Sequence, residues 1–255
     1  LVIVGGRIID GSGSPWYRAD LGVRGDRIAA IGPLTDAPSA RRIDAQGCVV
    51  CPGFIDAHQH GEVGVLVNPT LDLSVRQGIT TVLVGLCGMS AAPAVEPCMA
   101  DQRWYADELR ERGLHWRSFG EYLACLDGRP AINVASLVGF DNIRITILGF
   151  DAAAPTQAQL ADMQAVATEA MAEGAVGMSH GAGPASLWSS HAEVAAVARA
   201  VGRKGGLYVS HVRVIKSDDV LAPYAEAIAV GAEADLPVQI THFKTMNAAL
   251  YGRAE

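Results

Sequence analysis

One short motif contains the residues best suited to bind a metal ion. His58 and His60 form an HxH pair directly after the apolar run of residues 53–57. If this run is a β-strand, residues i and i+2 face the same side, so both imidazoles can reach one ion. Neutral imidazole is a common zinc ligand. The pair therefore predicts a metal site at the carboxyl end of a strand.

Four more candidate ligands stand where other apolar runs end. His180, His211 and His242 each close such a run, and Cys87 lies just past another. The carboxyl ends of parallel barrel strands meet at one rim, where such barrels carry their active sites. A cysteine thiolate is a zinc ligand as well. A single strand-end histidine more often makes only hydrogen bonds, but the HxH pair with two further strand-end histidines indicates a metal site.

The first fifty residues favour a small β module. Short apolar or alternating runs are separated by turn residues such as Gly5-Gly6, Gly25-Asp26 and Gly32-Pro33. This pattern predicts the N-terminal part of a small β-sandwich module over residues 1–51. The expected strands are Leu1–Val4, Ile8–Ile9, Ala19–Val23, Arg27–Ile31 and Cys48–Val50.

After Pro52, short apolar strands alternate with longer helical patterns. Such strands are typical of a parallel sheet that is buried on both faces, with helices as the crossovers. The alternation predicts an α/β fold over residues 52–255, namely a (β/α)8-type TIM barrel that is truncated after about six strands. The expected strands are Gly53–Ala57, Thr80–Val84, Ile132–Val138, Ala175–Ser179, Gly206–Ser210 and Pro237–Thr241.

Helices are expected between these strands, and the clearest covers Pro155–Glu173. The segment Gly88–Pro130 is longer than a simple crossover, so it predicts an inserted helical excursion. Capping pairs mark three helix beginnings. They are Thr156 with Gln159, Ser118 with Glu121, and Ser190 with Glu193.

The bulk composition argues against several classes of protein. The 255 residues carry a formal net charge of -7 and a pI of about 5.5, so the chain has no broad electrostatic reason to bind nucleic acid or an anionic membrane. It has no signal peptide and no apolar stretch near the roughly 20 residues of a membrane helix, so we expect a cytoplasmic protein. The five cysteines lack the regular spacing of a disulfide scaffold. Leu1 already lies inside a strand-like run, so we expect a fragment.

The motifs resemble those of a known enzyme family. Residues 52–60, PGFIDAHQH, resemble the signature of the amidohydrolase superfamily. Residues 77–93, QGITTVLVGLCGMSAAP, are similar to the pattern QGxTTVxxGxCGxSxAP of the D-aminoacylase (N-acyl-D-amino-acid deacylase) family. Residues 205–213 and 241–244 continue the likeness, which extends over nearly the whole chain. The sequence thus resembles the N-terminal part of this family.

The resemblance implies a zinc site and assigns its ligands. Cys87, His211 and His242 hold the tightly bound metal, and His58 with His60 forms or approaches a second metal position. It also implies zinc-dependent hydrolysis of a linear amide, from an N-acyl-D-amino acid to a D-amino acid and a carboxylate. The implied partner is a small-molecule substrate with a carboxylate.

Other residues are candidates for binding that substrate, and some depart from the family pattern. Lys244 and Arg213 lie just beyond ligand histidines, so they are candidates for holding the substrate carboxylate. Phe140, His180 and Leu86 replace the family's usual His, Thr and Asn. These changes surround the expected pocket. His180 is therefore a candidate pocket residue or supplementary ligand.

The family places its general base and acid, an aspartate, at the end of the eighth barrel strand. That position lies beyond residue 255, so we expect the chain alone to be inactive and its open barrel edges to associate with another chain. Two alternatives stay open. One is a cyclic-amide hydrolase of the dihydroorotase or hydantoinase type, although residues 175–180 lack the lysine that such enzymes carboxylate. The other is a non-catalytic metal-binding half-barrel.

Overall fold

The structure is a computed structural model that describes residues 1–94, 105–181, 183–213 and 221–243. The chain divides into two compact units, Leu1–Phe54 and Ile55–Glu255. The second unit contains all five predicted ligands, and the first contains none. In the described parts of the chain, no helix is long and apolar enough to cross a membrane.

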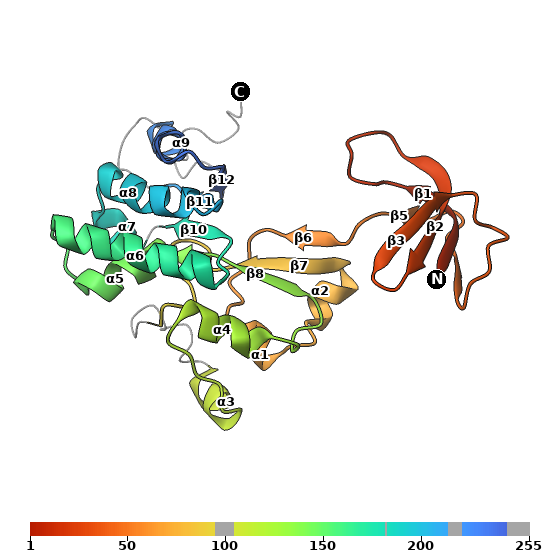
Figure 1. Cartoon of the computed structure of the whole chain (residues 1–255), viewed down its shortest axis with the longest axis horizontal. Coiled ribbons are helices and arrows are strands. Elements are labelled where there is room, and N and C mark those ends of the chain that lie inside the picture. Colours follow the sequence, from red (N-terminus) through yellow and green to blue (C-terminus); the bar gives the residue numbers. More distant parts are fainter. Residues whose placement is uncertain (95–104, 182, 214–220, 244–255) are drawn as a thin grey trace, which may run out of the picture. The chain divides into compact units, whose positions relative to one another are not determined.

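The first unit is built on one five-stranded sheet with the order β3-β2-β1-β4, in which β5 also pairs with β1 (Figure 1). Strands β1, β2 and β3 form an antiparallel meander, whereas β4 and β5 run parallel to β1. The strands are β1 (Val2–Ile8), β2 (Tyr17–Arg24), β3 (Arg27–Gly32), β4 (Arg42–Asp44) and β5 (Val49–Val50).

The predicted turn at Gly5-Gly6 is wrong, because β1 continues through it as one strand. The register of β1 on β2 shifts between Ile3 and Gly6, and Gly5 has a φ of 73°. A glycine with positive φ can form a β-bulge as readily as a turn. Here the Gly5 N–H donates to the Asp20 carboxylate at 2.9 Å, which fixes the bulge. The short strand β4 was not predicted, since its three residues carry no apolar run.

Two mainly parallel sheets, with orders β6-β7-β8 and β12-β11-β10-β9, lie in the second unit, except that β6 begins at Phe54, the last residue of the first unit. The predicted strand Ile132–Val138 is divided at Leu137, because β8 pairs with β7 whereas β9 pairs with β10. The α/β prediction is confirmed. The strands are β6 (Phe54–Asp56), β7 (Ile79–Val84), β8 (Asn133–Ser136), β9 (Val138–Gly139), β10 (Gly177–His180), β11 (Leu207–His211) and β12 (Val238–Thr241).

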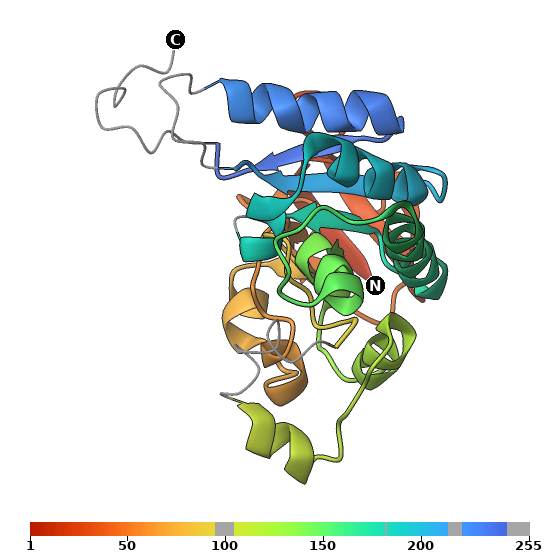
Figure 2. The same ribbon diagram turned by 90° about the vertical axis from the view of Figure 1, so that its left-hand side faces the viewer.

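Nine helices are described in this unit, and α8 and α9 pack on each other and along β10 to β12 (Figures 1 and 2). Both complete capping boxes, at Ser118 and Thr156, are confirmed, and Ser190 accepts from the Glu193 N–H. The helices are α1 (Gly64–Val67), α2 (Asp72–Arg76), α3 (Ala106–Glu111), α4 (Phe119–Leu126), α5 (Phe140–Leu148), α6 (Gln157–Glu173), α7 (Pro184–Trp188), α8 (His191–Gly202) and α9 (Ala222–Ala234).

The two faces of the strands enter different cores. Met178 and Tyr208 belong to the large core formed with the helices, whereas Val209 packs with Leu83 and Leu137 in a smaller cluster. Successive side chains of a strand point to opposite faces, so these two clusters lie on opposite sides of the sheet. The face of Val209 is the one on which residue 211 also lies.

Candidate metal centre

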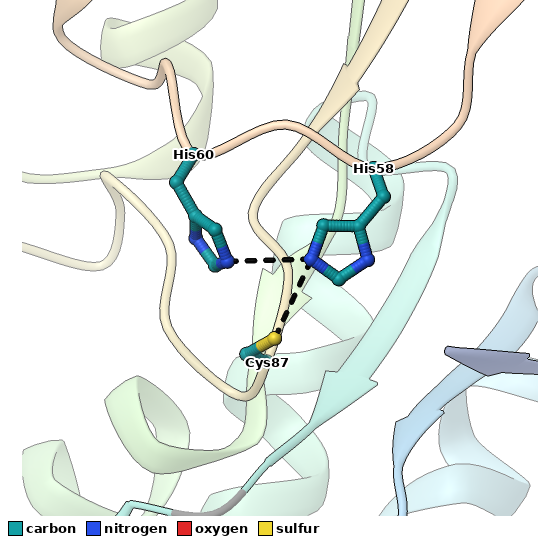
Figure 3. A group of neighbouring side chains, drawn as sticks. All are labelled: His58, His60 and Cys87. Carbon is teal, nitrogen blue, oxygen red and sulfur yellow. Dashed lines mark hydrogen bonds between the residues drawn. The ribbon is translucent and has the colours of Figure 1, made fainter. Parts of the chain in front are cut away.

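The structure brings all five predicted ligands together around the thiol of Cys87. Its Sγ lies 3.2 Å from His211 Nδ1, 3.6 Å from His242 Nε2 and 3.6 Å from His58 Nε2. His58 Nε2 and His60 Nε2 are 3.3 Å apart, and Figure 3 shows both imidazoles directed toward the same space as the thiol. Side chains from four strand ends therefore meet at one point.

These distances suit zinc. Two groups of three ligands, His58–His60–Cys87 and Cys87–His211–His242, each have their donor atoms within 4.8 Å of one another. Zinc–sulfur bonds of about 2.3 Å and zinc–nitrogen bonds of about 2.0–2.1 Å give tetrahedral edges of roughly 3.5 Å for S···N and 3.3 Å for N···N. The observed separations agree within a few tenths of an ångström. The donor set and its spacing fit zinc, with Cys87 common to both groups.

Backbone conformation aims the ligands at the ends of their strands. His211 shares the face of Val209 because the two are separated by one residue in β11. Thr241 is the register partner of His211, so strict alternation would turn His242 to the opposite face. Instead His242 has a φ of 52°, and Cys87 has a φ of 55°. Such left-handed residues cost about 1–2 kcal/mol each and persist only where their surroundings hold them.

The Cys87 thiol must lose a proton before it can bind a metal ion. Burial, and then the nearby Glu62 carboxylate, raise the pKa of the Cys87 thiol to about 11. Burial, followed by His242, His60 and His211, lowers the pKa of His58. At neutral pH the metal-free thiol is therefore protonated and His58 is uncharged. Metal binding must release the thiol proton, so affinity rises with pH.

The main chain of Cys87-Gly88 is held by residues of β10, of the segment after it and of α5. The Gly88 N–H donates to Ser179 Oγ at 3.0 Å, and the Gly88 carbonyl accepts from the Asp141 N–H at 2.9 Å. Gly181 lies so close that a Cβ there would overlap the carbonyl oxygen of Cys87. Ser179, Asp141 and Gly181 were not predicted. The first two are ordinary polar residues in the sequence, and only the fold places them against Cys87.

Gly181→Ala is expected to displace Cys87 and to weaken metal binding at least tenfold, since the added methyl group meets main chain that cannot rotate away. Isothermal titration with zinc measures the effect. Gly64→Ala is the matched control, because a Cβ at Gly64 would meet nothing within 4 Å. Equal zinc affinity in the two variants would contradict this role of Gly181.

The buried carboxyl of Asp141 belongs to the same group of contacts around Cys87-Gly88. Ser186 Oγ accepts from the Gly181 N–H at 3.1 Å and donates to Asp141 Oδ1. Asp141 is only 2% exposed. Burial raises the pKa of Asp141 to about 6, although the Ser186 hydrogen bonds and Arg144 act in the opposite direction. The charged form of Asp141 is thus disfavoured in the folded protein.

This raised pKa predicts a pH-dependent loss of stability. A carboxyl whose folded pKa exceeds its unfolded value of 3.8 stabilises the fold below that value, and the contribution is lost as pH rises through about 6. Relative to Asp141→Asn, the wild type should lose about 2 kcal/mol of unfolding free energy between pH 4 and pH 7. Urea unfolding of both metal-free proteins across this range measures the difference. A difference that does not change with pH would contradict the shift.

The structure places His180 away from the five ligands. It ends β10, where its register partner is Ser210, so it faces the helices and not the side of His211. The ring is 2% exposed, packs edge-on against Phe140 at 5.2 Å and lies 3.5 Å from Ser189 Oγ. Burial lowers the pKa of His180 to about 3, which keeps the ring neutral. In this position it stabilises the loop before α8.

Arg213 is also engaged elsewhere. Its guanidinium forms an ion pair with Glu226 of α9 and donates to the carbonyl groups of Ser186 and Ser189. The side chain is 13% exposed. Arg213 therefore connects α9 to the segment before α8. Lys244, the other candidate for the substrate carboxylate, lies outside the described residues.

Comparison with known proteins identifies the family of the chain. Residues 41–252 match the model of the amidohydrolase family. The chain belongs to this family. Among its curated relatives, a D-aminoacylase from Alcaligenes xylosoxydans xylosoxydans is 40% identical over an alignment 257 positions long, which covers 100% of this chain and 52% of that protein. An N-acyl-D-glutamate deacylase from the same organism is 39% identical, and the alignment again covers 100% of this chain and 52% of that protein.

Solved amidohydrolase structures extend the comparison to three dimensions. The crystal structure of a D-aminoacylase has a TM-score of 0.85 and 37% identity, and covers 99% of this chain and 53% of that one. The structure of an N-acyl-D-glutamate deacylase from Bordetella bronchiseptica, complexed with zinc and a phosphonate inhibitor, has a TM-score of 0.80 and 39% identity. It covers 93% of this chain and 50% of that one. A D-hydantoinase shares the fold at 16% identity and a TM-score of 0.53. The chain spans about half the length of the relatives it matches.

Proposed function

We propose that this chain supplies the metal centre of a zinc-dependent amidohydrolase that cleaves N-acyl-D-amino acids to a D-amino acid and a carboxylate. The observation that carries the proposal is the Cys87 thiol within 3.6 Å of three imidazole nitrogens. The relatives named above, a D-aminoacylase and an N-acyl-D-glutamate deacylase, support the substrate class.

The proposed architecture is a (β/α)8 barrel with a small β-sandwich module. Strands β6 to β12 follow one another in chain order within their two sheets, as successive strands of such a barrel do. Residues 1–51 contribute one sheet of the module, and residues 52–255 contribute six strands of the barrel. The ligands then lie at the carboxyl rim, where barrels of this kind carry their active sites.

Each ligand has a proposed place. Cys87, His211 and His242 hold the tighter zinc ion, and His58 and His60 complete a second position with the same thiol. Zinc bound there supplies Lewis-acid chemistry, since it polarises a carbonyl oxygen and makes water more acidic. The Cys87 thiol gives up its proton when it binds the ion. The proton acceptor proposed for hydrolysis is a strand-end aspartate beyond residue 255.

We propose that one of the candidate residues binds the substrate directly and that two others act on the pocket through a loop. Lys244, two residues after His242, is our candidate for binding the substrate carboxylate through a charge-assisted hydrogen bond. Arg213 and His180 shape the same region indirectly, because both hold the segment that ends at Ser189. Changes at these two positions should therefore affect substrate choice through the loop.

The function is tested with the complete gene product that carries residues 1–255. Zinc-loaded protein is assayed against N-acetyl-D-leucine, N-acetyl-D-glutamate and N-acetyl-D-aspartate, with the L enantiomers and hydantoin as comparisons. Hydrolysis of a D substrate that is lost on zinc removal and restored by zinc supports the proposal. Activity on hydantoin alone, or no zinc-dependent activity on any D substrate, would refute it.

A further inference from the structure

One carboxylate connects the two segments that carry His58, His60 and Cys87. The segment His58–Glu62, here the HxH loop, ends in Glu62, whose Oε1 accepts from the Gly85 N–H at 2.8 Å. The main-chain carbonyl of Glu62 accepts from the hydroxyl of the fully buried Tyr122 at 2.8 Å. Glu62 is therefore fixed at both its main chain and its carboxylate.

The donor on the other side is a main-chain group that has left its sheet. Gly85 follows the last residue of β7 and has a φ of 80°, and a Cβ there would overlap the carbonyl oxygen of Leu137. The chain turns sharply at this point toward Cys87, so the Gly85 N–H needs an acceptor outside the strand. Glu62 provides one, and a carboxylate is a stronger acceptor than a neutral group.

We propose that Glu62 is a positioning residue that fixes the HxH loop against the segment of Cys87 and thereby sets the affinity of the second metal position. This inference rests on the proposed function, since it assumes that both groups of ligands bind metal. Figure 3 shows His58 and His60 on one continuous segment beside Cys87, so a shift of that segment separates the two imidazoles from the thiol together.

The effect should be selective, because Cys87 has other supports. Its main chain is held through Gly88 by Ser179 and Asp141, which do not depend on Glu62. The HxH loop is joined to β7 by the Gln59 N–H, which donates to the Leu83 carbonyl at 3.1 Å, and beyond β7 by Glu62. Loss of the Glu62 contact therefore releases His58 and His60 more than it releases Cys87.

The test is a cadmium titration of the complete gene product, followed by the sulfur-to-cadmium charge-transfer absorption and by calorimetry. Glu62→Met keeps the length of the side chain and removes the acceptor, whereas Glu62→Gln keeps an acceptor oxygen. Glu62→Asp keeps the charge but is one methylene too short to reach Gly85. Glu173→Met is the matched control, because Glu173 also accepts from a main-chain N–H, that of Gly120 at 2.8 Å.

The wild type should bind two equivalents of cadmium, and Glu173→Met should bind two equivalents with the same affinities as the wild type. Glu62→Met and Glu62→Asp should weaken the second equivalent about 10- to 100-fold and change the first by less than about threefold, as loss of a residue that orients ligands does. Glu62→Gln should restore the second equivalent to within about threefold of wild type. If Glu62→Met does not fold, the comparison of Glu62→Asp with Glu62→Gln decides.

Three results would overturn the inference: an unchanged second equivalent in Glu62→Asp and Glu62→Met, an equal loss of both equivalents, or a Glu62→Gln variant as weak as Glu62→Met. A wild type that binds a single equivalent overturns it as well. Failure of the proposed metal centre gives a different result, because the wild type would then bind no cadmium at this thiol and show no charge-transfer absorption. Failure of the proposed activity is detected separately, by the hydrolysis assay.

Discussion

Cys87→Ala is expected to abolish zinc binding at both metal positions, because the thiol is common to both groups of ligands. Loss of a residue that only orients a ligand typically costs 10- to 100-fold in metal affinity. Removal of the shared ligand itself should therefore cost more than about a hundredfold at each position. His60→Ala, in contrast, removes a ligand of one group only and should keep the first equivalent of zinc.

Zinc content after dialysis against a zinc buffer measures this effect, with affinities obtained by competition with a chelator. Cys125→Ala is the matched control, since Cys125 is another partly buried free cysteine, and its thiol lies near the His115 carbonyl at 3.7 Å. The control should retain the zinc of the wild type. A Cys87→Ala protein that keeps one tightly bound zinc would show that the thiol is not a ligand.

Arg144→Met should lower the free energy of unfolding by about 3–5 kcal/mol, because it leaves a buried carboxylate without its partner. Arg144 Nε lies 2.9 Å from Glu193 Oε1, and the two side chains are 0% and 3% exposed. The same guanidinium donates to the carbonyl groups of Asp151 and Ala153 at 2.6 and 2.7 Å. One residue of α5 thus holds α8 and the loop before α6.

Thermal unfolding should show a decrease in Tm of roughly 6–20 °C for Arg144→Met, at about 2–4 °C per kcal/mol for a chain of this size. The double variant Arg144→Met, Glu193→Leu removes both charges and should recover part of the loss. Arg110→Met is the control, since its ion pair with Asp107 is 77% and 87% exposed and should contribute less than about 1 kcal/mol. Equal Tm values for Arg144→Met and the control would contradict this interpretation.

Local patterns in the sequence predicted the strands and helix beginnings well, because short-range physics determines them. The capping boxes at Ser118 and Thr156 need only four consecutive residues. The prediction that His58 and His60 face the same side needs only strand alternation, continued a few residues past the end of the strand. What could not be predicted is strand register. His180 and His211 end neighbouring strands, yet His180 pairs with Ser210 and faces the helices.

The supports of the site were equally beyond local patterns. Ser179 Oγ meets the Gly88 N–H across 91 residues of sequence, and Glu62 meets Gly85 across 23. Such contacts depend on which strands become neighbours. Gly5-Gly6 illustrates a different limit, since the same residues suit a turn and a bulge. The pairing of β1 with β2 on both sides of these glycines decided between the two.

The shared thiol also gives a bound ion a mechanical role. Cys87 and His242 are 155 residues apart in sequence, and His58 lies on a third segment, so one or two ions join the ends of β6, β7, β11 and β12 as a cross-link would. An ion that binds only the folded chain stabilises it by about 2.7 kcal/mol when its free concentration is a hundred times the dissociation constant. A bound zinc ion would then stabilise the folded chain independently of any reaction that it catalyses.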